Sequence, residues 1–395
     1  MLAFFYYLCS MKILHTSDWH LGHQLYGYDR TYEQAAMLMQ IARIAEEESP
    51  DVFILAGDIF HVAQPSASIQ RMFVDAIDYI RGRCPEMKFI IIAGNHDSGT
   101  RHEIFSPVWR NMGVEAIGTV HYENPEEHIL EIGGKGYVVA LPYANERYVR
   151  EGFVQQLLDM VNNRNKGNLP VAMTAHTTLS GIDYSGHDLR GDSIIGGIES
   201  IDLMKMGEGY DYLALGHIHH GQYVRRGKGT ARYSGSPLPV SFDEDYPHTI
   251  SIVELDGHEM APKVRNILIE NPRPLITLPA TGRTNWDSAI KLLRQFPDDS
   301  DVYIRLNVAQ SDTLPPDAND EALQAVKEKK CRFCLINYKR EDGNKNIRKT
   351  LTVNEFKEES PIDIAGRYME SIGEKFDSEM KEMFQEVVRL LSEEE

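Results

Sequence analysis

The sequence predicts a layered α/β fold, and two observations carry this prediction. Short hydrophobic runs typical of buried strands alternate with helical segments from residue 12 to about residue 270. Five of these runs lead directly into Asp, Asn or His, which places those side chains at the carboxyl ends of strands, where open α/β sheets build their sites. The five predicted strands are Lys12–His15, Val52–Ala56, Phe89–Ala93, Val171–Ala175 and Tyr212–Leu215.

The segments between these strands indicate how the sheet is covered and closed. Apolar residues recur at three- and four-residue spacings in Tyr32–Glu48 and Ala67–Arg81, which predicts two amphipathic helices. After the fourth strand, the glycine-bearing stretch Ser180–Gly197 is expected to be a long loop. Ala231–Ser234 and Thr249–Leu255 are predicted to be closing strands of a second sheet.

Two prolines in Asn271–Pro274 predict a domain boundary. Beyond them, Leu275–Leu278, Trp286–Gln295 and Val302–Val308 have the patterns of a strand, a helix and a strand. Leu314–Asp317 contains two more prolines and is expected to break this unit. The sequence therefore predicts a small α/β module after the main domain.

The C-terminal segment has a helix start signal. Ser360 is suited to the N-cap, Pro361 to the first helical position and Asp363 to the positive end of the helix dipole. Apolar residues spaced three or four apart from Ala365 to Leu391 predict an amphipathic helix, or two helices broken near Gly373. Its apolar face either packs on its own domain or docks to a partner.

The charge distribution qualifies the formal net charge of −18. Such a charge argues against a nucleic-acid partner, because binding phosphates requires local positive charge. Residues 356–395 hold twelve acids against five bases, so this tail accounts for −7, whereas residues 327–349 hold nine bases against three acids. The basic segment is either a solvated strand surface or a contact for DNA or a partner.

Other global features favour a protein of the reducing cytoplasm. Four cysteines, including the lone CxxC motif Cys331–Cys334, are too few for a disulfide framework in 395 residues. No apolar run reaches the roughly 20 residues of a membrane helix. Residues 1–10 lack the basic start and cleavage site of a secretion signal, and Met11 is expected to be the native start.

The side chains at the strand ends are those of a metal centre. Carboxylate, amide and imidazole ligands suit Mn²⁺, Fe²⁺ or Zn²⁺, and the absence of cysteine disfavours a purely structural zinc site. Two such ions about 3.5–4 Å apart can activate water and neutralise a phosphoryl group. Asp58 stands alone after its strand and is the natural bridge. The seven candidate ligands are Asp18, His20, Asp58, Asn95, His176, His217 and His219.

In its order D-x-H, G-D, G-N-H-D, H and G-H-x-H, this set resembles the calcineurin-like metallophosphoesterases. Within that superfamily, the segments Ile13–Gly22, Ala56–His61, Tyr212–His219 and Tyr233–Phe242 resemble the SbcD group, the nuclease subunits of a complex that repairs DNA double-strand breaks. The resemblance is strong over residues 11–275 and only general beyond them.

The resemblance implies a four-layer α-β-β-α metallophosphoesterase sandwich, a small α/β capping domain and a C-terminal helical segment that binds a partner. The corresponding boundaries are residues 11–272 for the nuclease domain, 273–355 for the capping and DNA-contact domain, and 356–395 for the docking segment.

The resemblance also implies a role for each site residue. Asp18, His20 and His219 would bind one ion; Asn95, His176 and His217 would bind the second; Asp58 would bridge them. Both ions are expected to be Mn²⁺. His96 would act as general acid on the leaving oxygen, a role suited to imidazole. His61 would be an auxiliary catalytic residue that contacts the phosphate or His96.

The implied activity is that of a Mn²⁺-dependent DNA phosphodiesterase, with exonuclease activity on duplex ends and endonuclease activity on single strands and hairpins. The implied partners are DNA, an SbcC-type ABC/SMC-like ATPase and a second copy bound through nuclease-domain helices, in DNA repair and recombination. Two alternatives remain open: a small-molecule nucleotide phosphoesterase on the same scaffold, and a non-catalytic assembly subunit. The parts after residue 275 argue against the first, and the intact ligand set with His96 argues against the second.

Other polar residues near the motifs are expected to be structural. Asp97 is predicted to hold a turn or orient a neighbouring ligand, His15 to be buried with its hydrogen bonds satisfied, and His220 to be exposed. Ordinary loop polarity is expected for Asp183, His187 and Asp192.

Overall fold

The computed structural model describes residues 10–144, 150–185, 200–224, 230–340 and 380–381. The chain divides into two compact units, residues 1–339 and 340–395. Apart from Arg340, Met380 and Lys381, the second unit lies outside the described residues. The helix predicted from Ser360 onward therefore lies outside them as well. Residues 1–9, His187 and Asp192 also lie outside them.

Two six-stranded sheets form the main domain. The first has the order β12-β11-β1-β2-β3-β4 and the second the order β5-β6-β7-β8-β10-β9. The first sheet consists of β1 (Met11–Thr16), β2 (Val52–Ala56), β3 (Lys88–Ile92), β4 (Val114–Ile117), β11 (Thr249–Leu255) and β12 (Lys263–Leu268). The second consists of β5 (Ile129–Glu131), β6 (Tyr137–Leu141), β7 (Val171–His176), β8 (Tyr212–Gly216), β9 (Gln222–Val224) and β10 (Thr230–Tyr233).

The strands that precede the metal-binding motifs run parallel within each sheet. In the first sheet β1 pairs with β2, and β2 with β3; in the second, β7 pairs with β8. The register brings the motif ends level, since Thr16 pairs with Leu55 and His176 with Gly216. All five motifs therefore leave their sheets at carboxyl ends, as predicted.

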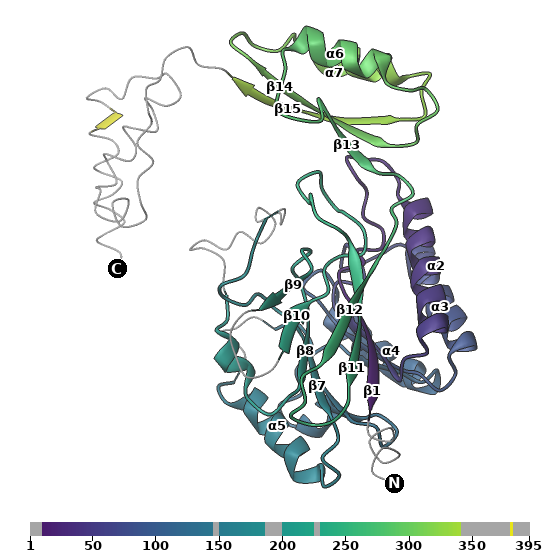
Figure 1. Ribbon diagram of the computed structural model, residues 1–395, viewed down its shortest axis with the longest axis vertical. Helices are drawn as coiled ribbons and strands as arrows, with labels where there is room; N and C mark the ends of the chain where they lie inside the picture. Colours follow the sequence, from purple (N-terminus) through teal and green to yellow (C-terminus); the bar gives the residue numbers. More distant parts are fainter. Residues whose placement is uncertain (1–9, 145–149, 186–199, 225–229, 341–379, 382–395) are drawn as a thin grey trace. The chain divides into compact units, whose positions relative to one another are not determined.

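Helices cover both outer faces, so the layers are α-β-β-α (Figure 1). Helices α2 (Thr31–Glu48), α3 (Ala67–Arg83) and α4 (Gly99–Asn111) lie on the first sheet, and α5 (Phe153–Arg164) lies on the second. A third core fills the space between the sheets. Leu14 of β1 faces the helices while its neighbour Ile13 faces the other sheet, which is why these strands are hydrophobic without alternation.

A three-stranded sheet forms the small module after residue 271. Its order is β13-β14-β15, and its core contains side chains of two helices. The elements are β13 (Leu275–Leu278), α6 (Trp286–Gln295), β14 (Tyr303–Gln310), α7 (Ala318–Val326) and β15 (Arg332–Arg340). Tyr303 donates a 2.5 Å hydrogen bond to Glu33 of α2, and Arg273 bonds to both Glu33 and Asp301. The contacts of Tyr303 and Arg273 with the buried Glu33 join the module to the main domain.

Helix α7 corrects the sequence prediction. The prolines of Leu314–Asp317 were expected to break the unit, but they directly precede this helix. Proline is compatible with the residues before a helix, because the first backbone N–H groups of the helix have no internal partner. Asp320 and Glu321 then lie in the first turn, where their charge suits the helix dipole.

The CxxC motif is not a redox or metal pair. Cys331 packs into the core of the module, whereas Cys334 packs with Leu25, Phe242 and Tyr303. The two thiols thus belong to different cores, and a strand rise of about 3.3 Å per residue places their Cα atoms roughly 10 Å apart, beyond disulfide reach. No helix among the described residues is long and apolar enough to cross a membrane.

Candidate metal centre

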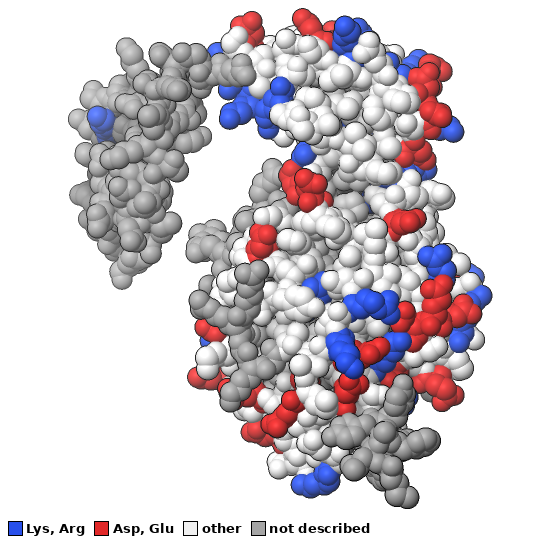
Figure 2. All heavy atoms as spheres, in the orientation of Figure 1, with Lys and Arg blue, Asp and Glu red and all other residues white. Residues whose placement is uncertain are grey.

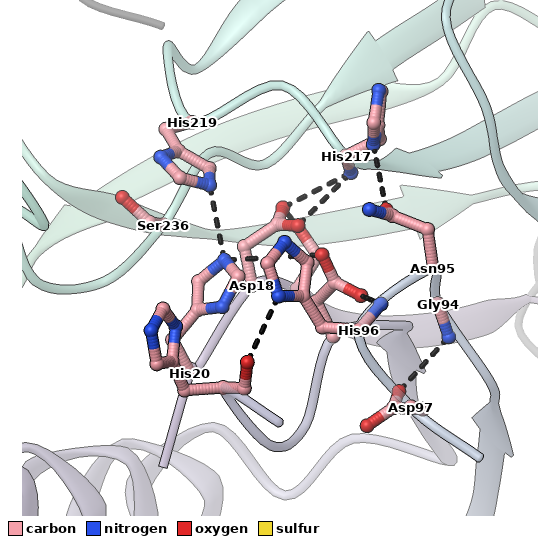
Figure 3. A network of polar contacts seen from close by, with 12 residues as sticks. Asp18, His20, Gly94, Asn95, His96, Asp97, His217, His219 and Ser236 are labelled. Carbon is pink, nitrogen blue, oxygen red and sulfur yellow. Dashed lines mark hydrogen bonds and ion pairs between the residues drawn. The ribbon is translucent and has the colours of Figure 1, made fainter. Parts of the chain in front are cut away.

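The predicted ligands converge where the two sheets present their carboxyl edges (Figure 3). The first sheet contributes the residues that follow β1, β2 and β3, and the second contributes the end of β7 and the turn after β8. From the first sheet come Asp18, His20, Asp58, Asn95 and His96; from the second come His176, His217 and His219.

The backbone at these residues is strained. Asp18, His20, Asp58 and His217 have φ angles of 54°, 44°, 50° and 98°, in the left-handed region that side chains other than glycine rarely adopt. Strain of this kind is maintained where the surrounding structure requires it and is typical of functional sites. Backbone hydrogen bonds of 3.0 Å from Asp18 to Gly57 and from His20 to Asp58 hold the turns together.

Glycine is required before two of the ligands. Gly57 has φ of +88°, and a Cβ there would lie 2.3 Å from Nδ1 of His176. A Cβ at Gly94 would lie 2.1 Å from Oδ1 of Asp58. The glycines of the G-D and G-N-H-D motifs therefore allow the ligand-bearing loops to approach each other closely.

One group of potential ligands comprises Asp18, His20 and His219. Their ligand atoms all lie within 4.8 Å of one another, and all three residues are buried. The Nε2 atoms of His20 and His219 are 3.1 Å apart, so both nitrogens face the same small volume. This group has the composition of an Asp-His-His metal site.

A second group comprises Asp58, His176 and His217, again with ligand atoms within 4.8 Å of one another. The Oδ1 atom of Asn95 lies 3.0 Å from Nε2 of His176 and 3.0 Å from Nδ1 of His217, so Asn95 completes this group. Oδ2 of Asp58 is 3.4 Å from Nε2 of His176 and 3.8 Å from Nε2 of His20. Asp58 therefore lies between the two groups.

His96 is held beside both groups. Its backbone N–H donates to Oδ1 of Asp58 at 2.9 Å, and its Nδ1 lies 2.9 Å from the carbonyl oxygen of His61. Donation from Nδ1 to that carbonyl leaves Nε2 for a substrate or a proton. The His96 ring stacks on that of His61 at 5.5 Å and meets that of His20 edge-on at 4.9 Å. Ring nitrogens of these three histidines form a third cluster within 4.8 Å.

Burial and mutual charge shift the pKa values within the centre. Burial lowers the pKa of His176, but the charge of Asp58 outweighs it and raises that pKa to about 9. The pKa of His219 is likewise raised to about 9, because Glu244 outweighs burial. Burial lowers the pKa of His20 and raises the pKa of Asp18. At Asp58, burial is outweighed by the charge of His176, which lowers the pKa of that carboxyl group. At neutral pH the raised pKa values favour the protonated forms of His176 and His219 when no metal is bound.

The donor set fits divalent ions. It combines carboxylate, amide and imidazole groups in a buried position. Among the residues that the structure describes, no cysteine belongs to these groups. Buried charges are stable only when paired or coordinated, and the adjacent carboxylates of Asp18 and Asp58 would each gain from a cation. The geometry thus brings all seven predicted ligands together with His96.

Three residues near the centre were not predicted. Glu244 lies behind His219, with Oε1 2.9 Å from Nδ1. The hydroxyl of Ser17 donates to Asp18 at 2.5 Å, and the ring of His23 lies 4.7 Å from that of His61. None belongs to a spacing pattern; the only signal for Glu244 is its position two residues after the Tyr233–Phe242 segment.

Predictions for other polar residues have mixed outcomes. Asp97 accepts hydrogen bonds from the backbone of Gly94, Ile59 and Phe60, which confirms its local structural role. His15 is fully buried and bonds to Tyr212 and Leu215, as predicted. The prediction for His220 was wrong, because its half-buried ring stacks on Tyr246 at 4.3 Å. Asp183 contacts Ser185 and His220, which is ordinary loop polarity.

Comparison with known proteins agrees with this geometry. The sequence model of the family described as "Calcineurin-like phosphoesterase" matches residues 11–221. The chain is 29% identical over 323 residues to a subunit of the nuclease SbcCD from Bacillus subtilis (strain 168), covering 77% of this chain and 80% of that protein. The corresponding subunit of Rhodobacter capsulatus is 29% identical, and the match covers 80% of this chain and 85% of that protein. The subunit of Escherichia coli (strain K12) is 26% identical, and the match covers 68% of this chain and 70% of that protein. The chain belongs to the calcineurin-like phosphoesterase family.

Proposed function

We propose that this protein is a DNA nuclease, a phosphodiester hydrolase that depends on two divalent metal ions, with Mn²⁺ as the preferred ion. The observation that carries the proposal is the position of Asp58 between two buried ligand groups, with His96 bonded to it through its backbone. The relatives that match most of the chain are named as nuclease subunits.

Each residue has a defined part in the proposed mechanism. Asp18, His20 and His219 would hold one ion, Asn95, His176 and His217 would hold the other, and Asp58 would be shared between them. When bound, the two ions supply activation of water and neutralisation of charge on the phosphoryl group. Nδ1 of His96 is fixed by the carbonyl of His61, so Nε2 can deliver a proton to the leaving oxygen. His61 stacks on this ring and supports its orientation.

The proposed substrates are duplex ends, single strands and hairpins of DNA. The surface charges do not by themselves identify a DNA-binding surface. On the face drawn in Figure 2, basic and acidic side chains of the described residues are interspersed. Two bound divalent ions would add four positive charges at the centre itself. The proposed site of substrate capture is therefore the metal centre, with the small module as a secondary contact.

The proposed domain roles follow the sequence boundaries. Residues 11–272 are the nuclease domain, residues 273–355 the capping and DNA-contact domain, and residues 356–395 the segment that docks to a partner. The partner is an SbcC-type ABC/SMC-like ATPase, because the relatives are named as one subunit of SbcCD. We place the complex in the cytoplasm, in DNA repair and recombination; the free thiols of Cys84, Cys331 and Cys334 suit a reducing compartment.

We further propose that two copies associate through helices of the nuclease domain. On α4, Ile104, Phe105 and Val108 are 70%, 50% and 57% exposed. Phe105 and Val108 also line an apolar groove with Phe73 of α3. An exposed apolar cluster beside an apolar groove is typical of a protein interface.

One experiment tests the activity and separates it from the alternatives. Blunt duplex DNA, hairpin DNA and nucleotide monoesters are incubated with Mn²⁺ and the protein, with and without the ATPase partner. We expect cleavage of DNA and roughly 10²- to 10⁴-fold slower cleavage by His96→Asn with metal binding retained. Faster hydrolysis of nucleotides than of DNA would favour a small-molecule phosphoesterase, and no hydrolysis of either would favour an assembly subunit.

A further inference from the structure

A buried carboxylate lies directly behind one of the metal-binding histidines. The side chain of Glu244 is fully buried, and its Oε1 lies 2.9 Å from Nδ1 of His219. Glu244 is neither one of the seven ligands nor near the reacting atoms. Its position on the far side of the His219 ring gives it access to Nδ1 only.

The second carboxylate oxygen of Glu244 is also engaged. Oε2 accepts a hydrogen bond from the backbone N–H of Val240 at 3.2 Å and from the hydroxyl of Ser236 at 3.4 Å, and Nε2 of His248 lies 3.8 Å away. Both oxygens therefore have fixed partners, and the carboxylate has one orientation relative to the His219 ring.

The loop that carries Glu244 is held at several points. Arg30 donates to the carbonyl of Pro239 at 2.6 Å, and Arg305 of β14 pairs with Asp243 at 2.5 Å. Phe242 packs with Tyr303 of the same strand. The small module thus contributes to the placement of the loop, and through it to the placement of the carboxylate.

This arrangement determines which nitrogen of the neutral His219 ring keeps its lone pair. A carboxylate only accepts hydrogen bonds, so Nδ1 of the neutral ring must carry the proton and Nε2 must hold the lone pair. Nε2 is the atom that faces the ligand group, 3.1 Å from Nε2 of His20. The opposite tautomer would direct the Nδ1 lone pair at the carboxylate and leave no lone pair for a metal.

We propose that Glu244 is a positioning residue of the metal centre, which holds His219 in the Nδ1–H form and presents Nε2 to the ion shared with Asp18 and His20. The proposal rests on the two-metal function above. Carboxylate partners of this kind orient metal-binding histidines and raise their basicity.

Two variants separate charge from hydrogen bonding. Glu244→Gln keeps an acceptor for Nδ1 but removes the charge and turns an amide donor toward the N–H of Val240. Glu244→Leu removes the acceptor altogether. The matched control is Glu127→Gln, because Glu127 also pairs with a histidine Nδ1, that of His121 at 2.7 Å, outside the predicted ligand set.

The first readout is Mn²⁺ binding, measured from the electron paramagnetic resonance signal of free Mn²⁺. We expect the wild-type chain and Glu127→Gln to bind two ions. One of the two sites should weaken by about 10-fold in Glu244→Gln and about 100-fold in Glu244→Leu, the usual range for loss of such a partner. The second readout is long-range ¹H–¹⁵N correlation of the Zn²⁺-loaded protein, where the Nδ1–H pattern of His219 should be present in the wild type and lost in Glu244→Leu.

Circular dichroism melting distinguishes a positioning role from a structural one. Wild-type affinity at both sites in both variants would overturn the proposal, and so would loss of both sites together with a collapse of Tm in Glu244→Gln. If the wild type binds two ions and fails to cleave DNA, the proposed function falls while the role of Glu244 stands.

Discussion

Oδ2 of Asp58 lies 3.4 Å from Nε2 of His176, and this contact links the two sheets of the sandwich. Asp58 follows β2 of the first sheet, whereas His176 ends β7 of the second. The same oxygen lies 3.8 Å from His20 of the other ligand group. One carboxylate thus contacts both halves of the centre, so its removal should affect both metal sites.

The first prediction concerns Asp58→Asn. An amide keeps the shape of the side chain but removes the charge that both ions would share, so we expect both Mn²⁺ sites to weaken together. DNA cleavage should fall by about 10²- to 10³-fold, the equivalent of several kcal/mol of charge stabilisation. Calorimetric titration with Mn²⁺ and a duplex cleavage assay provide the measurements. Asp183→Asn, in a loop, is the control, and loss of only one site would contradict a bridging role.

The second prediction concerns the pH dependence of metal binding. The pKa values of His176 and His219 are raised to about 9, so each holds a proton at neutral pH that a metal ion must displace. We expect Mn²⁺ affinity to increase between pH 6.5 and 9, by up to about tenfold per pH unit for each proton released. Titration in buffers of different ionisation enthalpy counts the released protons. Binding that does not change with pH would show that the ions displace no proton from either histidine.

The same shifts have a consequence for stability. A histidine with a raised pKa in the folded state stabilises the metal-free protein fully below its unfolded pKa of about 6.5, and this contribution is lost as pH rises through 9. The metal-bound protein does not lose this stabilisation as pH rises, because its metal-binding histidines are already deprotonated. The increase in Tm on adding Mn²⁺ should therefore be larger at pH 9 than at pH 6.5.

The third prediction separates two cations of the basic segment. Arg332 pairs with Asp301 and lies over the ring of Tyr303, whereas Lys330 is exposed. Lys330→Ala should therefore weaken DNA binding and reduce the slope of log K against log salt by about one, the effect of losing one phosphate contact. Arg332→Ala should lower stability by up to about 1 kcal/mol, the value of a partly exposed ion pair.

Fluorescence anisotropy over a salt series and thermal melting measure these two effects. An unchanged salt slope for Lys330→Ala would leave the basic segment with a structural role only. Lys329 already favours such a role, because it pairs with Asp298 and donates to the carbonyl of Phe296.

The sequence predicted those parts of the fold in which local pattern and tertiary role agree. Strand β2 occurs at Val52–Ala56 as predicted, because a strand buried on both faces is a continuous apolar run with a polar end. Helix α4 was not predicted, since Pro107 lies inside it and three of its apolar residues face outward, which obscures the amphipathic pattern.

The candidate site shows the same distinction. Its ligands are recognisable because each follows a strand within a short motif. Glu244 follows no strand, and its partner His219 is 25 residues away. Only the folded loop brings them together, so no spacing rule could have identified the pair.

The last prediction concerns the apolar surface of α4. Ile104 is 70% exposed, with Phe105 and Val108 beside it, and burial of such side chains in an interface contributes about 25 cal/mol per Å² of apolar area. Ile104→Glu would place a charge in that interface, so we expect a dimeric wild type and a monomeric variant at micromolar concentration. Sedimentation equilibrium provides the measurement. Met204→Glu is the matched control, because Met204 is 79% exposed but lies on a different element, the 3₁₀ helix Leu203–Met206. If Met204→Glu dissociated the dimer and Ile104→Glu did not, the interface would not lie on α4.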